Sequence, residues 1–237
     1  MAHEPRTIPN PMALTHPSPN YGDRRGDARI SLVVLHYTAM TTAAEALERL
    51  REPETEVSAH YLIAEDGTLA SLVAEDKRAW HAGAGRWGAV GDVNSASIGI
   101  ELANDARSPF PEPQMSALER LLGDVMARHA LAPQAVIAHS DLAPGRKRDP
   151  GRLFDWRRLA QAGLSVWPSA GPDADPGGFL RDARAFGYTA DAPPDDILTA
   201  FRLRFRPDAD GPVDATDAAM AADLARRFPV DAGPPTS

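Results

Sequence analysis

The residues best suited to chemistry in this 237-residue chain lie in one loop and at the end of one distant apolar run. The loop, 137–151, carries His139 near its start and Lys147 and Asp149 near its end. Far earlier, His36 follows the apolar run 30–35. Two histidines at the ends of predicted strands, with a carboxylate, supply the three ligands of a catalytic zinc site and leave a fourth position for water. We therefore predict a zinc site.

Two aspartates compete for the role of third ligand. Asp149 closes the loop, whereas Asp141 forms an H-x-D pair with His139. Strand alternation would place His139 and Asp141 on one face, so Asp141 is either a ligand or a residue that orients one by hydrogen bonding. The loop also holds Lys147, one of only two lysines among 25 basic residues, and this choice of a compact ammonium indicates a functional role.

Composition narrows the class of protein. With 43% hydrophobic residues, the chain is long enough for one ordinary domain and a small second one. It has no cysteine, which leaves His, Asp and Glu as the available metal ligands. A net charge of -8 argues against a nucleic-acid partner. Without an apolar N-terminal segment or a run of 18 apolar residues, we expect neither a signal peptide nor a membrane span.

The chain up to residue 168 alternates between strand and helix patterns. After an extended arm (1–29), short apolar runs predict strands at 30–37, 96–102 and 134–139, and the Asp66-Gly67 dipeptide predicts a hairpin with a two-residue turn within 58–73. Helical spacing predicts helices from a Thr42 cap to Arg51, up to His129, and over 155–163. The fold class is therefore α/β, with a central mixed sheet flanked by helices.

Two further features suggest a binding groove beside the predicted metal ligands. The loop 80–95 is rich in glycine and aromatic residues and has no period, which is typical of a binding loop. We expect it to contact substrate through these residues: Trp80, His81, Arg86, Trp87 and Asn94, although loop packing is an equal alternative for His81. The strand 96–102 ends in Glu101, and a carboxylate there is costly unless it is paired or used. His60 is expected to be a satisfied core residue.

The composition changes after residue 168. A linker (169–175) leads to a segment without lysine or glutamate that shows three short amphipathic patterns, at 176–187, 194–205 and 214–228. This predicts a catalytic domain (30–168), a three-helix domain (176–230) and a disordered tail (231–237).

The assembled motifs resemble the zinc-dependent N-acetylmuramoyl-L-alanine amidases of the type-2 amidase family, which are related in fold to peptidoglycan recognition proteins. The matching pieces are VVLHYT, SAHYLIAEDG, AWHAG, NSASIGIEL and HSDLAPGRKRDPG, in order over about 17–168. The C-terminal segment is similar to a peptidoglycan-binding three-helix module.

The resemblance implies one Zn²⁺ per chain, held by His36, His139 and Asp149, with Asp141 in support. It also implies that Glu101 is the catalytic acid and base and that Lys147 stabilises the oxyanion. The expected reaction is hydrolysis of the amide between the lactyl group of N-acetylmuramic acid, including its 1,6-anhydro form, and L-alanine of peptidoglycan stem peptides, in cell-wall turnover or recycling.

Two other functions remain as alternatives. One is a non-catalytic peptidoglycan sensor, which the presence of all three ligands disfavours, and the other is a hydrolase of a different amide. We expect a monomer that binds muropeptides. A cytoplasmic location follows from the missing signal, whereas the C-terminal module points to the periplasm or envelope.

Overall fold

The computed structural model describes residues 14–169, 171 and 174–230. The predicted tail (231–237), the start of the arm (1–13) and part of the linker (170, 172–173) lie outside these residues. The expectation of a mixed sheet flanked by helices is confirmed. Six strands form one sheet in the order β1-β5-β4-β7-β3-β8, and β2 and β6 form a separate pair. No helix within the described ranges is both long and apolar enough to cross a membrane.

The centre of the sheet consists of parallel strands. β3 (Leu32–Tyr37) pairs in parallel with β7 (Ser97–Leu102) on one side and with β8 (Val136–Ala138) on the other. β7 also pairs in parallel with β4 (Tyr61–Ile63). Because parallel strands are buried on both faces, these segments appear in the sequence as short apolar runs.

The hairpin predicted around Asp66-Gly67 is present, but its turn has three residues (65–67) instead of two, since the N–H of Ala64 donates to the carbonyl of Thr68. β4 runs antiparallel to β5 (Leu69–Ser71), and Gly67 has a φ of +85°, which suits glycine. The arm contains more structure than expected, because β1 (Leu14–Thr15) pairs with β5 and β2 (Tyr21–Asp23) pairs with β6 (Lys77–Ala79). Such short strands have too few residues to show a periodic pattern.

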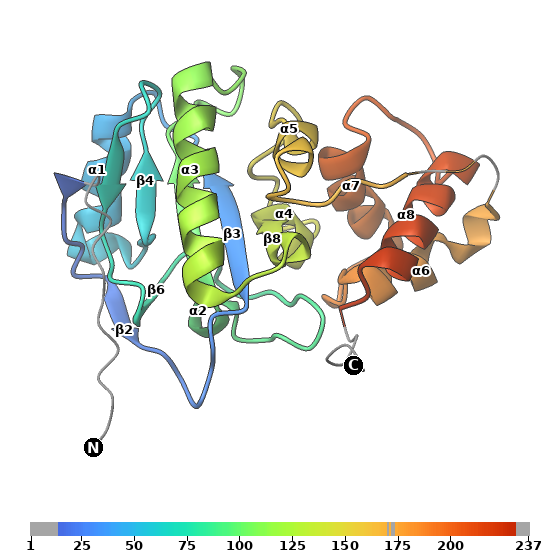
Figure 1. Cartoon of the computed structure of the whole chain (residues 1–237), viewed down its shortest axis with the longest axis horizontal. Coiled ribbons are helices and arrows are strands. Elements are labelled where there is room, and N and C mark those ends of the chain that lie inside the picture. Colours follow the sequence, from blue (N-terminus) through green and yellow to red (C-terminus); the bar gives the residue numbers. More distant parts are fainter. Residues whose placement is uncertain (1–13, 170, 172–173, 231–237) are drawn as a thin grey trace.

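Helices cover both faces of the sheet. The long α3 (Glu112–His129) packs with α5 (Trp156–Gln161) against one face, in a cluster that includes Val33, Leu35 and Ile100. On the opposite face, α1 (Ala43–Arg51) begins at its predicted cap, where the Thr42 side chain accepts from the backbone N–H of Glu45. Figure 1 shows α3 lying along the sheet, with α1 near the edge remote from β8.

The three helices predicted for the C-terminal segment are α6 (Phe179–Phe186), α7 (Pro194–Phe205) and α8 (Ala215–Arg227). They lie on the β8 side of the molecule (Figure 1). Their aromatic residues share one buried cluster with Val34, Ile137 and Leu142 of the sheet and its following turn. The C-terminal helices therefore pack against the sheet through a continuous apolar core.

Candidate metal centre

Strand alternation brings the first site residues to one face of the sheet. Along β7, Ile98, Ile100 and Leu102 point toward α3, which turns Ser97, Gly99 and Glu101 to the other face. On β3 the same alternation turns His36 away from α3, and its Cα is the register partner of the Cα of Glu101. A candidate metal ligand and a carboxylate therefore stand side by side on neighbouring strands.

His139 was predicted to end a strand, but the structure places it in a helix. The strand β8 ends at Ala138, and His139 is the first residue of a one-turn helix, α4 (His139–Leu142). The loop after α4 returns Asp149 to the same place, where the backbone N–H of Ser140 donates to the carbonyl of Asp149 at 3.0 Å. This bond joins the two ends of the loop, so both ends face His36.

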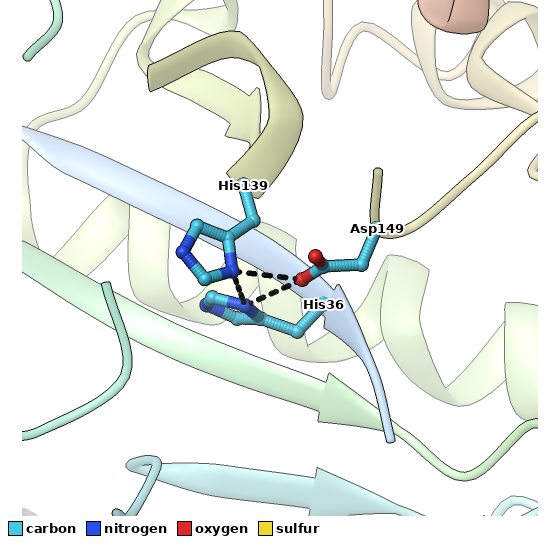
Figure 2. Close-up of side chains that lie close together, drawn as sticks. All are labelled: His36, His139 and Asp149. Carbon is cyan, nitrogen blue, oxygen red and sulfur yellow. Dashed lines mark hydrogen bonds and ion pairs between the residues drawn. The ribbon is translucent and has the colours of Figure 1, made fainter. Parts of the chain in front are cut away.

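Three ligand atoms converge from these segments. Each pair among His36 Nδ1, His139 Nδ1 and Asp149 Oδ2 is 2.9 Å apart, and all three side chains are buried. Figure 2 shows the triangle, with His36 on its strand, His139 at the start of α4 and Asp149 on the loop. A triangle of this size lets one ion lie about 2 Å from every atom, as zinc does with imidazole and carboxylate ligands. Two imidazoles and one carboxylate suit a catalytic zinc ion and leave coordination positions open.

Hydrogen bonds on the outer side of each histidine ring fix which ring nitrogen is free to bind a metal. The His139 Nε2–H donates to the carbonyl of Ala82 at 2.9 Å, which leaves Nδ1 as the lone-pair nitrogen. His36 Nε2 lies 3.0 Å from His81 Nδ1, and His81 Nε2 lies 3.2 Å from Ser97 Oγ.

The donor and acceptor in each hydrogen bond of the series His36–His81–Ser97 follow from the bond that Ser97 donates. The Ser97 hydroxyl donates to the carbonyl of Val93 at 2.6 Å, so its oxygen accepts from the Nε2–H of His81. His81 Nδ1 then accepts from the Nε2–H of His36, and His36 Nδ1 carries the lone pair. Hydrogen bonds of this kind orient metal-binding histidines and set their tautomers.

The space for His81 depends on a glycine. A Cβ at Gly99 would lie 2.4 Å from His81 Cγ, so the ring occupies the place that any other residue at position 99 would fill. Asn94 holds the adjoining backbone, since its Oδ1 accepts from the N–H groups of His81 and Ala82. These residues lie behind the ligand histidines.

The electrostatics keep the ligands in the forms that bind metal. Burial and the neighbouring His139 lower the pKa of His36 to about 4, so its ring is neutral near pH 7. Burial alone would raise the pKa of Asp149, but hydrogen bonds with His139 and His36 hold it well below the usual value. A neutral imidazole and an ionised carboxylate are what zinc requires.

The pKa of Glu101 is raised, whereas that of Asp149 is lowered. Burial, followed by the charge of Asp149, raises the pKa of Glu101 to about 8, and Lys147 opposes this shift. Its Oε2 is buried and has no hydrogen-bond partner among the described residues. A carboxylate oxygen without a hydrogen-bond partner beside the triangle of candidate ligands is suited to exchanging protons with substrate or water.

The site opens into a cavity of about 250 Å³. Its walls include the three ligands together with Glu101 and Lys147, and it extends along Trp80 and His81. Other wall residues were not predicted from the sequence: Tyr37, Thr38, Met40, Arg49 and Ser58. Tyr37 and Thr38 directly follow His36 at the end of a parallel strand, where α/β sheets place ligands, and this position was a usable signal.

Three residues expected to contact substrate lie elsewhere. Trp87 is 3% exposed, and its indole packs edge-on against Phe186 and Tyr188 of the C-terminal segment. Asn94 is buried in its bonds to the backbone, and Arg86 is exposed outside the cavity wall. The glycine and aromatic content of the loop 80–95 did not distinguish the residues that line the cavity, such as Trp80, from those that pack into the core, such as Trp87.

His60 and Asp141 take structural positions. His60 is buried, and its Nδ1 accepts from the N–H of Gly99, consistent with the core role expected for it. Asp141 points away from the ligand triangle, and its oxygens accept from Ala138 N–H, Tyr188 and Arg204. The rival H-x-D arrangement fails because His139 and Asp141 lie on a helical turn, where residues two apart do not share a face.

Comparisons with known proteins identify a family and several relatives of this chain. The family model described as N-acetylmuramoyl-L-alanine amidase matches residues 26–152. The N-acetylmuramoyl-L-alanine amidase AmiD of Escherichia coli is 34% identical over 239 residues, which cover 86% of this chain and 85% of AmiD. The 1,6-anhydro-N-acetylmuramyl-L-alanine amidase AmpD of Haemophilus influenzae is 30% identical over 159 residues, covering 60% of this chain and 86% of AmpD.

Solved structures of amidases are similar to this chain. The complex of E. coli AmiD with the substrate anhydro-N-acetylmuramic acid-L-Ala-D-gamma-Glu-L-Lys has a TM-score of 0.76 and 33% identity, covering 86% of this chain and 92% of that one. AmpDh3 from Pseudomonas aeruginosa in complex with anhydromuramic pentapeptide has a TM-score of 0.77 and 31% identity, covering 88% and 94%. The likeness extends beyond residues 26–152 to most of the chain.

Proposed function

Because the chain belongs to the N-acetylmuramoyl-L-alanine amidase family, we propose that it hydrolyses the amide bond between the lactyl group of N-acetylmuramic acid and L-alanine of peptidoglycan stem peptides. The observation that supports this most strongly is the buried triangle of His36, His139 and Asp149 beside Glu101, whose buried Oε2 has no hydrogen-bond partner in the part of the chain that the structure describes. A binding protein that only recognised peptidoglycan would have no need to keep a complete ligand set, so this argues against the non-catalytic sensor.

We assign one zinc ion per chain to the triangle. When bound, zinc supplies a Lewis acid that polarises the amide carbonyl and acidifies water. The chain positions the ligand atoms: the Nδ1 atoms of His36 and His139 and the Oδ2 of Asp149 face one point. The Nε2–H of His139 donates to the carbonyl of Ala82, and the Nε2–H of His36 donates to His81 Nδ1.

Glu101 performs the proton transfers. Its carboxylate accepts a proton from the attacking water and returns it to the nitrogen of the L-alanine leaving group as the C–N bond breaks. For this it must be ionised when the water attacks, and a pKa near 8 lies close to the range that suits a group required both to take and to give a proton.

Lys147 and the cavity walls bind the reacting amide. Lys147 lines the cavity on the loop that carries Asp149, and its ammonium stabilises negative charge on the carbonyl oxygen during attack. Trp80 provides an aromatic wall, and Arg49 adds positive charge to the side formed by α1, which suits the carboxylates of a stem peptide.

Muropeptides with a 1,6-anhydro sugar are the first substrates to test, since the AmiD and AmpDh3 structures contain such molecules. Defined anhydro-muropeptides, their reducing-end counterparts and whole sacculi are incubated with the protein, with and without a chelator, and the products are identified by mass spectrometry. The proposal predicts release of intact stem peptides that chelator stops and added zinc restores. Release that continues in chelator would exclude the zinc mechanism.

A further inference from the structure

The strand and turn that deliver His139 are contacted by the C-terminal helices. β8 is the last strand of the six-stranded sheet, so among the described strands one of its edges has no partner. α7 lies on the β8 side of the sheet and contacts α4 (Figure 1), and Phe186, Phe201 and Phe205 share a buried cluster with Ile137 and Leu142. An uncovered sheet edge exposes unpaired backbone groups, and here the helices cover it.

One arginine connects the two parts. Arg204 of α7 has a fully buried side chain, and its guanidinium donates to Asp141 Oδ2 at 2.6 Å and to the carbonyl of Val136 at 3.0 Å. The same group lies 4.4 Å from the ring centre of Trp156. Two different nitrogens of the planar guanidinium thus reach the β8 backbone and the α4 turn, whereas a lysine would have a single nitrogen for both.

A tyrosine completes the contact. Tyr188 is buried, and its hydroxyl donates to Asp141 Oδ1 at 2.6 Å. Burial raises the pKa of Tyr188 well above its usual value, so the hydroxyl stays protonated as a donor. Asp141 also accepts from the Ala138 N–H at 2.9 Å, which closes the turn around His139.

The α4 turn needs such support. It is a helix of four residues, too short to be stable by itself, so its geometry is set by tertiary contacts. His139 is its first residue and lies directly between Ala138 and Ser140. Any rotation of the turn moves His139 Nδ1 relative to His36 and Asp149.

We infer that the C-terminal helices are a structural part of the metal site, in which Arg204 and Tyr188 act through Asp141 as positioning residues for His139. This role rests on the proposed function only in that His139 is taken as a zinc ligand. It assigns the C-terminal segment a task inside the amidase unit, independent of any glycan binding by its own surface.

The cleanest test removes one hydroxyl. Tyr188→Phe keeps the ring and its packing but loses the bond to Asp141. Tyr61→Phe is the matched control, because Tyr61 is also buried and donates to a carboxylate, Glu75, at 2.7 Å, away from the cavity wall. Metal-free full-length protein is titrated with zinc against a competing chelator, and the visible spectrum of the cobalt-substituted protein reports the ligand geometry.

We expect zinc affinity to fall about tenfold or more in Tyr188→Phe, within the range for loss of groups that support a metal ligand. Its cobalt spectrum should change, whereas Tyr61→Phe should retain both wild-type properties. Equal affinities and spectra in wild type and Tyr188→Phe would overturn the inference. If the wild type itself binds no zinc, the proposed function fails instead, so the two failures are distinct.

A second pair of variants tests the arginine. Arg204→Lys is compared with Arg202→Lys, since Arg202 lies on the same helix and forms a buried ion pair with Asp217 inside the helical segment. Both substitutions should lower the thermal midpoint, but only Arg204→Lys should weaken zinc binding in the folded protein. An equal loss of zinc affinity in the two variants would mean that general destabilisation causes it, and would overturn the inference. If Arg204→Lys does not fold, the tyrosine pair decides.

Discussion

His36 and Glu101 are register partners on the neighbouring parallel strands β3 and β7, and both point to the face of the sheet opposite α3. The backbone ladder therefore sets the separation between a metal ligand and the proposed base. Sites built on strands hold their geometry better than sites built on loops. Here one ligand and the base come from the rigid centre of the sheet, while the other two ligands come from a turn and a loop that need additional bonds.

Replacing Glu101 by glutamine separates metal binding from catalysis. Glu101→Gln keeps the shape of the side chain but cannot accept a proton, so we expect kcat to fall by about 10²–10⁴. Zinc content, measured by elemental analysis, should equal that of the wild type because Glu101 is not in the ligand triangle. Turnover within a factor of a few of the wild type would remove Glu101 from the mechanism.

The raised pKa of Glu101 has a consequence for the metal-free protein. Between the ordinary value of 4.5 and the folded value of about 8, the folded state holds a proton that the unfolded chain has released, so stability falls as pH rises through this window. Above pH 8 the ionised, buried carboxylate costs on the order of a few kcal/mol.

Glu101→Gln removes this titration. In denaturant unfolding of metal-free protein, the wild type should therefore lose stability relative to the variant between pH 5.5 and pH 8.5, because the buried histidines contribute to both proteins alike. Identical pH dependence in the two proteins would mean that Glu101 titrates near its ordinary pKa in the folded state.

Metal removal should destabilise as well as inactivate. The proposed zinc ion would bind only the folded triangle, so free zinc at about 100 times its dissociation constant should add about 2.7 kcal/mol to the free energy of unfolding. Calorimetry with and without chelator should show a thermal midpoint that rises with zinc concentration. His36→Ala, which lacks one ligand, should lose most of this zinc-dependent rise.

The histidine behind the metal ligand can be displaced without removing any polar group. Gly99→Ala puts a methyl group where the His81 ring lies, so we expect the ring to move and the hydrogen bond to His36 to weaken. Zinc affinity should drop about 10–100-fold, as it should in His81→Ala. Trp80→Phe serves as the control, since Trp80 lines the cavity and should affect KM rather than zinc affinity.

The role of Lys147 is tested by removing its charge. Lys147→Met retains much of the aliphatic stem, and we expect kcat to fall by about 10²–10³, the range for loss of one oxyanion-stabilising group. Zinc affinity should change little, because the ammonium is not a ligand. A variant that loses zinc in proportion to its activity would point to a structural role for the loop residue instead.

Local patterns in the sequence determined much of this protein. The apolar runs of β3 and β7, the hairpin at Gly67 and the three C-terminal helices were predictable, because each depends on residues close together in the chain. The residues that meet at the metal centre were identified from their types and from motif resemblance. His36 and Glu101 also follow from strand ends, where parallel sheets place chemistry.

Only the tertiary structure decided what lies behind and beside these residues. Asp141 turned out to face Arg204, 63 positions later, and His81 turned out to support His36 through a space left by Gly99. Trp87 was drawn into the core by aromatic residues of the C-terminal segment. Such contacts join side chains that no local period relates. They depend on how whole helices pack against the edge of the sheet, which is settled only when the complete core forms.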